Sequence, residues 1–275
     1  MLHLLRPYVE RFPALAHAFR HLRDELRLRA LAPRATPWGF SLLGDDSMVD
    51  GRFEPDETAL LGALFGDADV FVDVGAYVGL FTCMAATRGL RAVAVEPLDE
   101  NLRCLYANLH NNGLRDVEVF PMGLAETAGL RTLYGGTTGA SLREGWSNAS
   151  AQVARTVPVT TLDTLLRGRF EGRRLVVKMD IEGAELDALA GCAETLARTP
   201  APVWLVEVCL TENLPVGAVN GDFSAVFERF WGAGYGCRSV GPDAREVTPD
   251  DVARWTAARA RDFGTPNFLF TRAMA

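Results

Sequence analysis

The sequence predicts an α/β fold with a mostly parallel sheet and helices on both of its faces. Short apolar runs that are expected to be strands alternate along the chain with segments of helical periodicity. A glycine-spaced turn joins the first of these strands to the helix that follows it. The 275 residues, of which 48% are hydrophobic, are enough to bury one substantial core. Together these features are typical of βαβ units built into a single main domain.

The predicted elements follow one another in βαβ order. The first five strands are expected at residues 70–74, 91–95, 117–120, 174–179 and 203–208. Helical patterns lie between them at residues 80–86, 101–111 and 184–198. A helix over 223–231 then precedes two last strands, at 235–240 and 267–271. Residues 130–162 contain a Gly-Gly pair and a β-branched run, which predict an inserted hairpin with a mobile loop at its tip.

Residues 1–50 are expected to be a helical extension ahead of the main domain, which covers residues 51–275. The apolar residues of one helical face are Leu15, Ala18, Phe19, Leu22 and Leu26, and the arginines of another are Arg20, Arg23 and Arg27. We expect this helix to pack on the acidic body of the protein or, in a homo-oligomer, on a second subunit. The alternatives are a helix that lies on an anionic membrane surface and one that covers the active site.

Composition and charge narrow the classes of partner and compartment. The net charge is −7 although arginines are enriched before residue 37, so the body is acidic and we expect no nucleic-acid partner. The longest uncharged stretch, residues 74–87, is too short for stable membrane insertion, and charges interrupt the first apolar residues, unlike a signal peptide. The five cysteines form no Cys-x-x-Cys pair, so neither disulfides nor a thiolate zinc site is indicated. These features predict a cytoplasmic protein.

The segment 70–79, VFVDVGAYVG, predicts a ligand-binding turn. Asp73 closes the strand, Gly75 and Gly79 let the backbone approach a ligand, and the next helix begins facing the site. A dinucleotide site favours Gly-x-Gly-x-x-Gly for its pyrophosphate, whereas this turn is Gly-x-x-x-Gly with Tyr77 inside it. Fewer glycines suit a ligand without pyrophosphate, and the acid suits a ligand with an ammonium group. The motif therefore favours S-adenosylmethionine (SAM) over a nicotinamide cofactor.

A second carboxylate supports a nucleoside ligand. Glu96 ends the second predicted strand, twenty-one positions after Gly75, and Pro97 stops that strand. In a βαβ unit a carboxylate at this spacing reaches the two ribose hydroxyls. Sites for SAM and for NAD both use such an acid, so Glu96 does not choose between them.

Six blocks of sequence, in order, resemble the FkbM-type family of class I SAM-dependent methyltransferases. They are FVDVGAYVGL (71–80), VEPLDENLRCLYANLHNNGL (95–114), VEVFPMGLAETAGLRTLY (117–134), VPVTTLDTLL (157–166), VKMDIEGAELDALAG (177–191) and LVEV (205–208). The combination of KMDIEGAE with DVGAxxG is the most specific part of the set. The sequence departs from the family at Tyr77, where Asn is usual, and at Ala125-Glu126, where a polar pair is common.

The resemblance implies a fold, a cofactor and a reaction. The fold is the Rossmann-like class I methyltransferase sheet, with strand order 3-2-1-4-5-7-6 and an antiparallel last strand. The reaction is O-methylation of a small molecule such as a polyketide, sugar or lipid precursor in natural-product biosynthesis, with SAM as cofactor. The implied cofactor-binding residues are Asp73, Gly75, Ala76, Tyr77, Gly79, Glu96, Pro97, Gly123, Leu124 and Asp180.

Methyl transfer to an alcohol requires a group that accepts the hydroxyl proton. Three of the four histidines precede the predicted core, and His110 lies at a helix end, so carboxylates are better candidates. We predict Asp180, Glu182 and Glu207 as catalytic residues, because they lie where the fourth and fifth strands end, the edge at which open α/β sheets bind ligands. Residues 130–156 and 210–222 are expected to form much of the acceptor pocket.

Lysine usage adds one more candidate. Lys178 is the single lysine among the 28 lysine and arginine residues, and it lies two positions before Asp180, on the same face of the strand. We predict that it acts in the site or in a buried pair, with Asp73, Asp180 or Glu207 as the partner whose charged form it favours.

The sequence leaves alternatives open for the use of a metal, the acceptor atom and the class of protein. The three carboxylates could bind Mg²⁺ and so lower the pKa of the acceptor hydroxyl, but they form no recognisable chelating set, and we favour a reaction without metal. Methylation of nitrogen, on a small molecule or peptide, is not separated from O-methylation. A nicotinamide-dependent oxidoreductase would need a Tyr-x-x-x-Lys or His near the fourth strand, which the sequence lacks. A SAM-binding protein without activity would be favoured by loss of Glu96 or of the glycines, and both are present.

Overall fold

The computed structural model describes residues 32–272, apart from 137–138, 147–152, 216 and 263. The predicted N-terminal helix lies outside the described residues. The described part begins with the hairpin of β1 (Arg34–Ala35) and β2 (Ser41–Leu42), followed by α3 (Asp46–Val49). Asn108 of α6 (Asp99–Asn111) joins this segment to the main domain, because its side chain bonds to both the backbone N–H and the carbonyl of Leu43.

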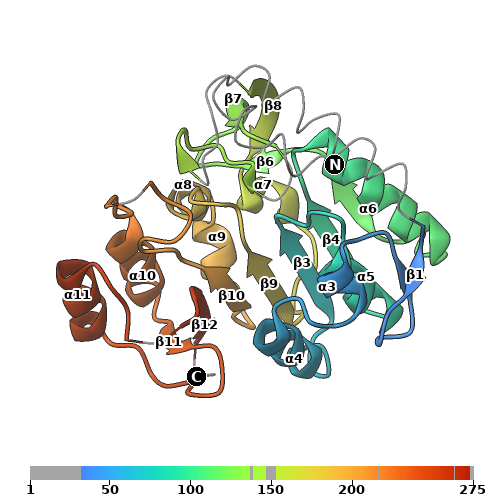
Figure 1. Cartoon of the computed structure of the whole chain (residues 1–275). Helices are drawn as coiled ribbons and strands as arrows, with labels where there is room; N and C mark the ends of the chain where they lie inside the picture. The colour runs from blue at the N-terminus through green and yellow to red at the C-terminus, as the bar shows by residue number, and fades with distance from the viewer. Residues whose placement is uncertain (1–31, 137–138, 147–152, 216, 263, 273–275) are drawn as a thin grey trace.

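A seven-stranded sheet forms the centre of the molecule (Figure 1). Its strands are β3 (Val70–Val74), β4 (Arg91–Val95), β5 (Glu118–Phe120), β9 (Leu175–Met179), β10 (Val203–Glu207), β11 (Gly236–Ser239) and β12 (Asn267–Thr271). They lie in the order β5-β4-β3-β9-β10-β12-β11, which in chain order is 3-2-1-4-5-7-6. The pairs from β5 to β10 are parallel, and β12 is antiparallel to both of its neighbours. The sheet therefore agrees with the predicted class.

Helices cover both faces of this sheet because its strands are apolar on both sides. In β3, the side chains of Val70, Val72 and Val74 join one core and Phe71 joins the other, as the two-residue period of a strand requires. The helices that pack in the core with Phe71 are α4 (Pro55–Leu64), α5 (Leu80–Thr87) and α6. Those of the opposite core are α7 (Leu162–Leu166), α8 (Glu185–Ala190), α9 (Ala193–Leu196), α10 (Phe223–Gly232) and α11 (Pro249–Ala258).

The predicted helix over 184–198 is instead two short helices, α8 and α9. They separate at Gly191, where a Cβ would lie 2.6 Å from the backbone carbonyl oxygen of Ala125. The second helix then begins anew, with its Glu194 and Thr195 N–H groups donating to the carboxylate of Asp163. Close backbone packing therefore interrupts a pattern that is helical in the sequence alone.

The predicted hairpin between the third and fourth central strands is confirmed. It consists of β7 (Gly129–Tyr134) and β8 (Ala154–Thr160), paired antiparallel, and β6 (Gly123–Leu124) adds to β8 in parallel. Leu133, Val157 and Val159 pack beneath it against Leu98, which follows β4. Figure 1 shows this small sheet above the central one.

Candidate active site

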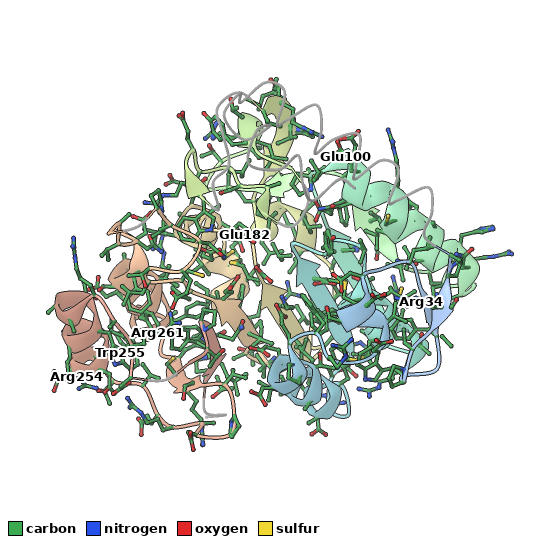
Figure 2. The ribbon with its side chains drawn as sticks, in the orientation of Figure 1. Arg34, Glu100, Glu182, Arg254, Trp255 and Arg261 are labelled. Atoms are coloured by element: carbon green, nitrogen blue, oxygen red, sulfur yellow. The ribbon has the colours of Figure 1, made fainter. Side chains whose placement is uncertain are left out.

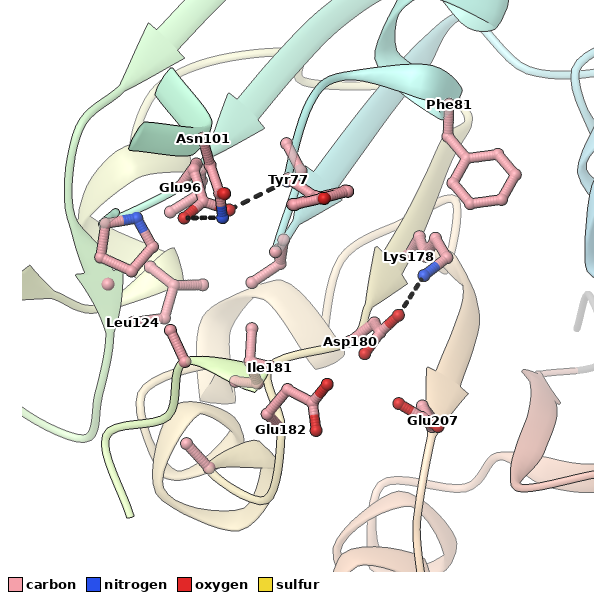
Figure 3. Close-up of a pocket in the computed structure, with 18 of the residues that line it drawn as sticks. Tyr77, Phe81, Glu96, Asn101, Leu124, Lys178, Asp180, Ile181, Glu182 and Glu207 are labelled. Atoms are coloured by element: carbon pink, nitrogen blue, oxygen red, sulfur yellow. Dashed lines mark hydrogen bonds and ion pairs between the residues drawn. The ribbon is translucent and has the colours of Figure 1, made fainter. Parts of the chain in front are cut away.

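A cavity of about 360 Å³ lies at the carboxyl edge of the central sheet. The ends of β3, β4, β9 and β10 contribute to its wall, and so do the small sheet and the segment between α3 and α4. The carboxyl edge is where open α/β sheets bind ligands, and the volume is in the range of small-molecule sites. Figure 3 shows Glu96 on one side of the cavity and Lys178, Asp180 and Glu207 on the other.

The turn after β3 depends on two glycines in the left-handed region. Gly75 has φ of 86°, and a Cβ there would overlap the backbone carbonyl oxygen of Asp180. Gly79 has φ of 85°, and a Cβ there would overlap the side chain of Leu105 on α6. The atoms that require glycine at these two positions are protein atoms, and the predicted approach of a ligand to this turn stays a prediction. Gly75 lines the cavity, whereas Gly79 is not among the described lining residues.

Three donors fix the carboxylate of Glu96 at the end of β4. Oε2 accepts the Tyr77 N–H at 2.9 Å, and Oε1 accepts the Leu98 N–H at 2.8 Å and the Asn101 side-chain amide at 3.2 Å. Burial raises the pKa of Glu96 to about 7, although the three hydrogen bonds lower it. A carboxylate accepts about four hydrogen bonds, so capacity for a ligand hydroxyl remains. Ala76 lies beside Tyr77 in the same wall.

The wall around Glu96 is largely apolar. Pro97, Gly123 and Leu124, which the sequence predicted, all line the cavity. Met122 and Leu142 extend this surface. Such a wall suits the flat face of a base or another apolar group held next to the carboxylate.

Asp73 lies beneath the cavity. Its side chain is buried and accepts the Thr82 hydroxyl of α5 at 2.5 Å, and it is not among the described lining residues. Burial raises the pKa of Asp73 to about 6, while Lys178 lowers it. The pleat of β3 turns this side chain toward α5, and the role of Asp73 in cofactor binding stays a prediction.

Buried Lys178 and half-buried Asp180 and Glu207 form one cluster (Figure 3). Lys178 Nζ donates to Asp180 Oδ2 at 2.8 Å and lies 5.1 Å from the centre of the Phe81 ring. Burial would raise the pKa of Asp180, but Lys178 and a hydrogen bond from Glu207 keep it below its ordinary value. Burial and the Asp180 charge raise the pKa of Glu207 well above its ordinary value. The two shifts have opposite directions, so Asp180 is the weaker base of the pair and Glu207 the stronger.

Glu182 faces the same cavity from the turn after β9. Its Oε2 accepts the Trp146 indole N–H at 3.0 Å and the Asn213 side-chain amide at 3.1 Å. Burial, followed by the Asp180 charge, raises its pKa to about 8. Its φ of 55° is left-handed, which costs about 1 to 2 kcal/mol for a residue with a Cβ. Backbone strain of this kind is concentrated at functional sites.

Three residues of the site were not singled out in the sequence, although Trp146 and Asn213 lie in the segments predicted to form the acceptor pocket, 130–156 and 210–222. Trp146 packs on Gly183, where a Cβ would overlap its ring, and Asn213 reaches Glu182 from the segment after β10. Neither residue has a local signal, since both meet Glu182 through the fold. Glu54 also lines the cavity, and the Glu-Pro pair that it forms with Pro55 is a recognisable helix start.

Metal clusters and membrane-spanning helices are not found among the residues that the structure describes. No group of three or more His, Cys, Asp or Glu side chains among them is arranged to hold a metal ion. His110 lies exposed in the last turn of α6, and the other histidines precede the described part. No helix in residues 32–272, as far as described, is long and apolar enough to cross a membrane. Figure 2 shows Glu182 near the middle of the molecule, with Arg254 and Trp255 at the periphery on α11.

Comparisons with solved structures return methyltransferases at low similarity. An O-methyltransferase from Bacillus cereus in complex with SAH is 13% identical, with 83% of this chain and 91% of that chain covered and a TM-score of 0.41. A SAM-dependent O-methyltransferase from Thermotoga maritima is 13% identical, with 86% and 74% covered and a TM-score of 0.41. A ribosomal protein L11 methylase from Lactobacillus delbrueckii subsp. bulgaricus is 12% identical, with 79% of each chain covered and a TM-score of 0.41.

The family comparison is more decisive. The search of curated proteins found no significant match. The family model described as the methyltransferase FkbM domain matches residues 73–236, more than half of the chain. This range contains the turn after β3, Glu96 and the cluster at the ends of β9 and β10. The chain belongs to the FkbM family of SAM-dependent methyltransferases.

Proposed function

We propose that the protein transfers a methyl group from SAM to a hydroxyl group of a small molecule, such as a polyketide, sugar or lipid precursor. One observation carries the proposal: a single cavity holds Glu96, which has acceptor capacity for ribose hydroxyls, and Glu182, a half-buried carboxyl with a pKa of about 8. A pKa near the working pH suits a general base. Family membership supports the methyl transfer, and the hydroxyl acceptor is the proposed part.

The lining fits SAM in shape and in charge. Glu96 has acceptor capacity for the ribose hydroxyls, and Pro97 and Leu124 offer apolar surface beside it for the adenine. Among the described lining residues, Lys178 is the single cation, and the acids are Glu54, Glu96, Asp180, Glu182 and Glu207. Such a cavity favours a cationic ligand. SAM supplies an electrophilic methyl group on a positively charged sulfonium.

Glu182 is the proton acceptor in this proposal, in preference to Asp180. Asp180 is ionised but weakly basic, because Lys178 stabilises its charge. Burial and the Asp180 charge raise the pKa of Glu207 and so favour its protonated form. Glu182 takes the hydroxyl proton as the new carbon–oxygen bond forms, and Trp146 and Asn213 keep its carboxylate in place.

Glu182→Gln tests this assignment, because it keeps the size of the side chain and removes its basicity. Transfer of a labelled methyl group from SAM is measured with panels of alcohols and of amines. We expect methylated alcohols from the wild type, and a loss of turnover by about 10² to 10⁴ in the variant with affinity for S-adenosylhomocysteine (SAH) retained. Glu194→Gln, an exposed site on α9 with the same change of charge, is the control and should keep wild-type turnover.

Two outcomes would contradict the proposal. Methylated amines without methylated alcohols would make the protein an N-methyltransferase. Wild-type turnover in Glu182→Gln, together with inactive Asp180→Asn that still binds SAH, would transfer the role of base to Asp180.

A further inference from the structure

Glu54 reaches the cavity from outside the segment that the family model matches. It lies between α3 and α4, immediately before Pro55, and lines the cavity together with Met48 and Phe53. The family match begins only at residue 73. Any role of Glu54 therefore belongs to the part of this chain that the family motifs do not describe.

One oxygen of the Glu54 carboxyl group is buried and unsatisfied. Oε2 has no hydrogen-bond partner, and the side chain does not cap α4. A buried polar atom without a partner costs free energy. The backbone adds to that cost, since φ of 41° and ψ of 63° are left-handed and disfavoured before proline. A strained position that presents an unpaired acid to a cavity indicates a partner supplied by a ligand.

The charges around Glu54 favour the binding of a cation. The charge of Lys178 is stabilised by Asp180, Glu54 and Asp73. Its hydrogen bond is donated to Asp180. Burial raises the pKa of Glu54 to about 7, Lys178 lowers it, and the neighbouring acids raise it further. One lysine therefore balances the acids on this side of the cavity incompletely, and a positively charged ligand group beside Glu54 would complete the balance.

The direction of the cofactor identifies that group. Glu96 and Leu124 mark the side of the cavity for the adenosine, and Figure 3 shows Lys178 and Phe81 on the opposite side. A cofactor with its ribose at Glu96 and its adenine against Leu124 extends its amino-acid end toward Lys178 and its electrostatic partner Glu54. Building on the proposed use of SAM, we propose that Glu54 binds the ammonium group of the cofactor's amino-acid end.

Two probes separate this contact from the rest of the cofactor site. SAH contains the adenosine, a thioether and the amino-acid end, whereas 5′-methylthioadenosine lacks the amino-acid end. Calorimetric titration of Glu54→Gln should show SAH affinity lowered roughly 10- to 100-fold, the effect of a lost hydrogen bond between charged groups. Affinity for 5′-methylthioadenosine should equal that of the wild type. Glu96→Gln should weaken both ligands, because the ribose is common to them.

A matched control excludes a general effect of charge. Asp56→Asn makes the same change of charge at an exposed position of α4 and should leave both affinities at wild-type values. Equal SAH affinity in Glu54→Gln and wild type would overturn the inference while leaving the proposed function intact, and so would an equal loss for both ligands. Wild-type protein that binds neither SAH nor SAM would instead overturn the proposed function.

Discussion

Gly75→Ala is expected to destabilise the protein more than an equivalent substitution elsewhere, because the new methyl group meets a neighbouring strand. The residue has φ of 86°, and its Cβ would overlap the Asp180 carbonyl oxygen. Gly89 has nearly the same φ, 87°, but a Cβ there has no heavy atom within 4 Å. Gly89→Ala therefore measures the backbone strain alone, about 1 to 2 kcal/mol. Gly75→Ala adds an overpacking cost of about 1 to 3 kcal/mol or more.

Urea denaturation of the two variants and the wild type gives the free energies of unfolding. We expect Gly75→Ala to lose at least about 1 kcal/mol more than Gly89→Ala. Its SAH affinity should fall as well, since relief of the overlap displaces Asp180 at the end of β9. Equal losses of stability in the two variants would refute the conclusion that Gly75 exists for the approach of β3 and β9.

Three other perturbations act on single carboxyl groups. Glu96→Ala should lower both the SAH affinity and the melting temperature, because the buried Leu98 N–H and the partly buried Tyr77 N–H lose their acceptor. An unchanged melting temperature would contradict these bonds. Trp146→Phe should raise the pKa of Glu182 by about one unit and move the acidic limb of the kcat/KM profile to higher pH, whereas an unmoved limb would exclude Glu182 as base. Burial raises the pKa of Glu185 from 4.5 to about 7, so the native state binds this proton more tightly than the unfolded state does. Its contribution to stability is therefore lost as pH rises from about 4.5 to about 7. Between these two pH values, urea denaturation should show a smaller loss of unfolding free energy in Glu185→Gln than in the wild type.

The sequence predicted the central sheet well because its strands and turns carry local signals. The apolar runs of β3, β4, β9 and β10 are buried on both faces, so their composition alone distinguishes them from the helices. Glu96 was found for the same reason, since its position at the end of β4 follows from spacing along the chain. The prediction of one continuous helix over 184–198 was wrong in its middle. A single glycine such as Gly191 is tolerated in a helical pattern, and only the fold shows that Ala125 packs against it.

The site was predicted less completely where it depends on contacts between distant segments. A motif does not show that Asp73 accepts the Thr82 hydroxyl, or that a Cβ at Gly79 would overlap Leu105. Glu54 lines the cavity from the segment before β3, and Trp146 contacts Glu182 from the segment between β7 and β8, so spacing alone could not bring them to Lys178 and Glu182. Carboxyl groups near one another also change each other's basicity, which is why Glu182 is the proposed base among the three predicted carboxylates.

Calorimetric titration of the wild-type protein with SAH and, separately, with NADH distinguishes a SAM site from a nicotinamide site. We expect SAH to bind one site per chain and Glu96→Gln to weaken this binding. We expect no binding heat from NADH, because the turn after β3 lacks the glycines of a pyrophosphate site. Binding of NADH without binding of SAH would contradict the assignment of the cavity to SAM.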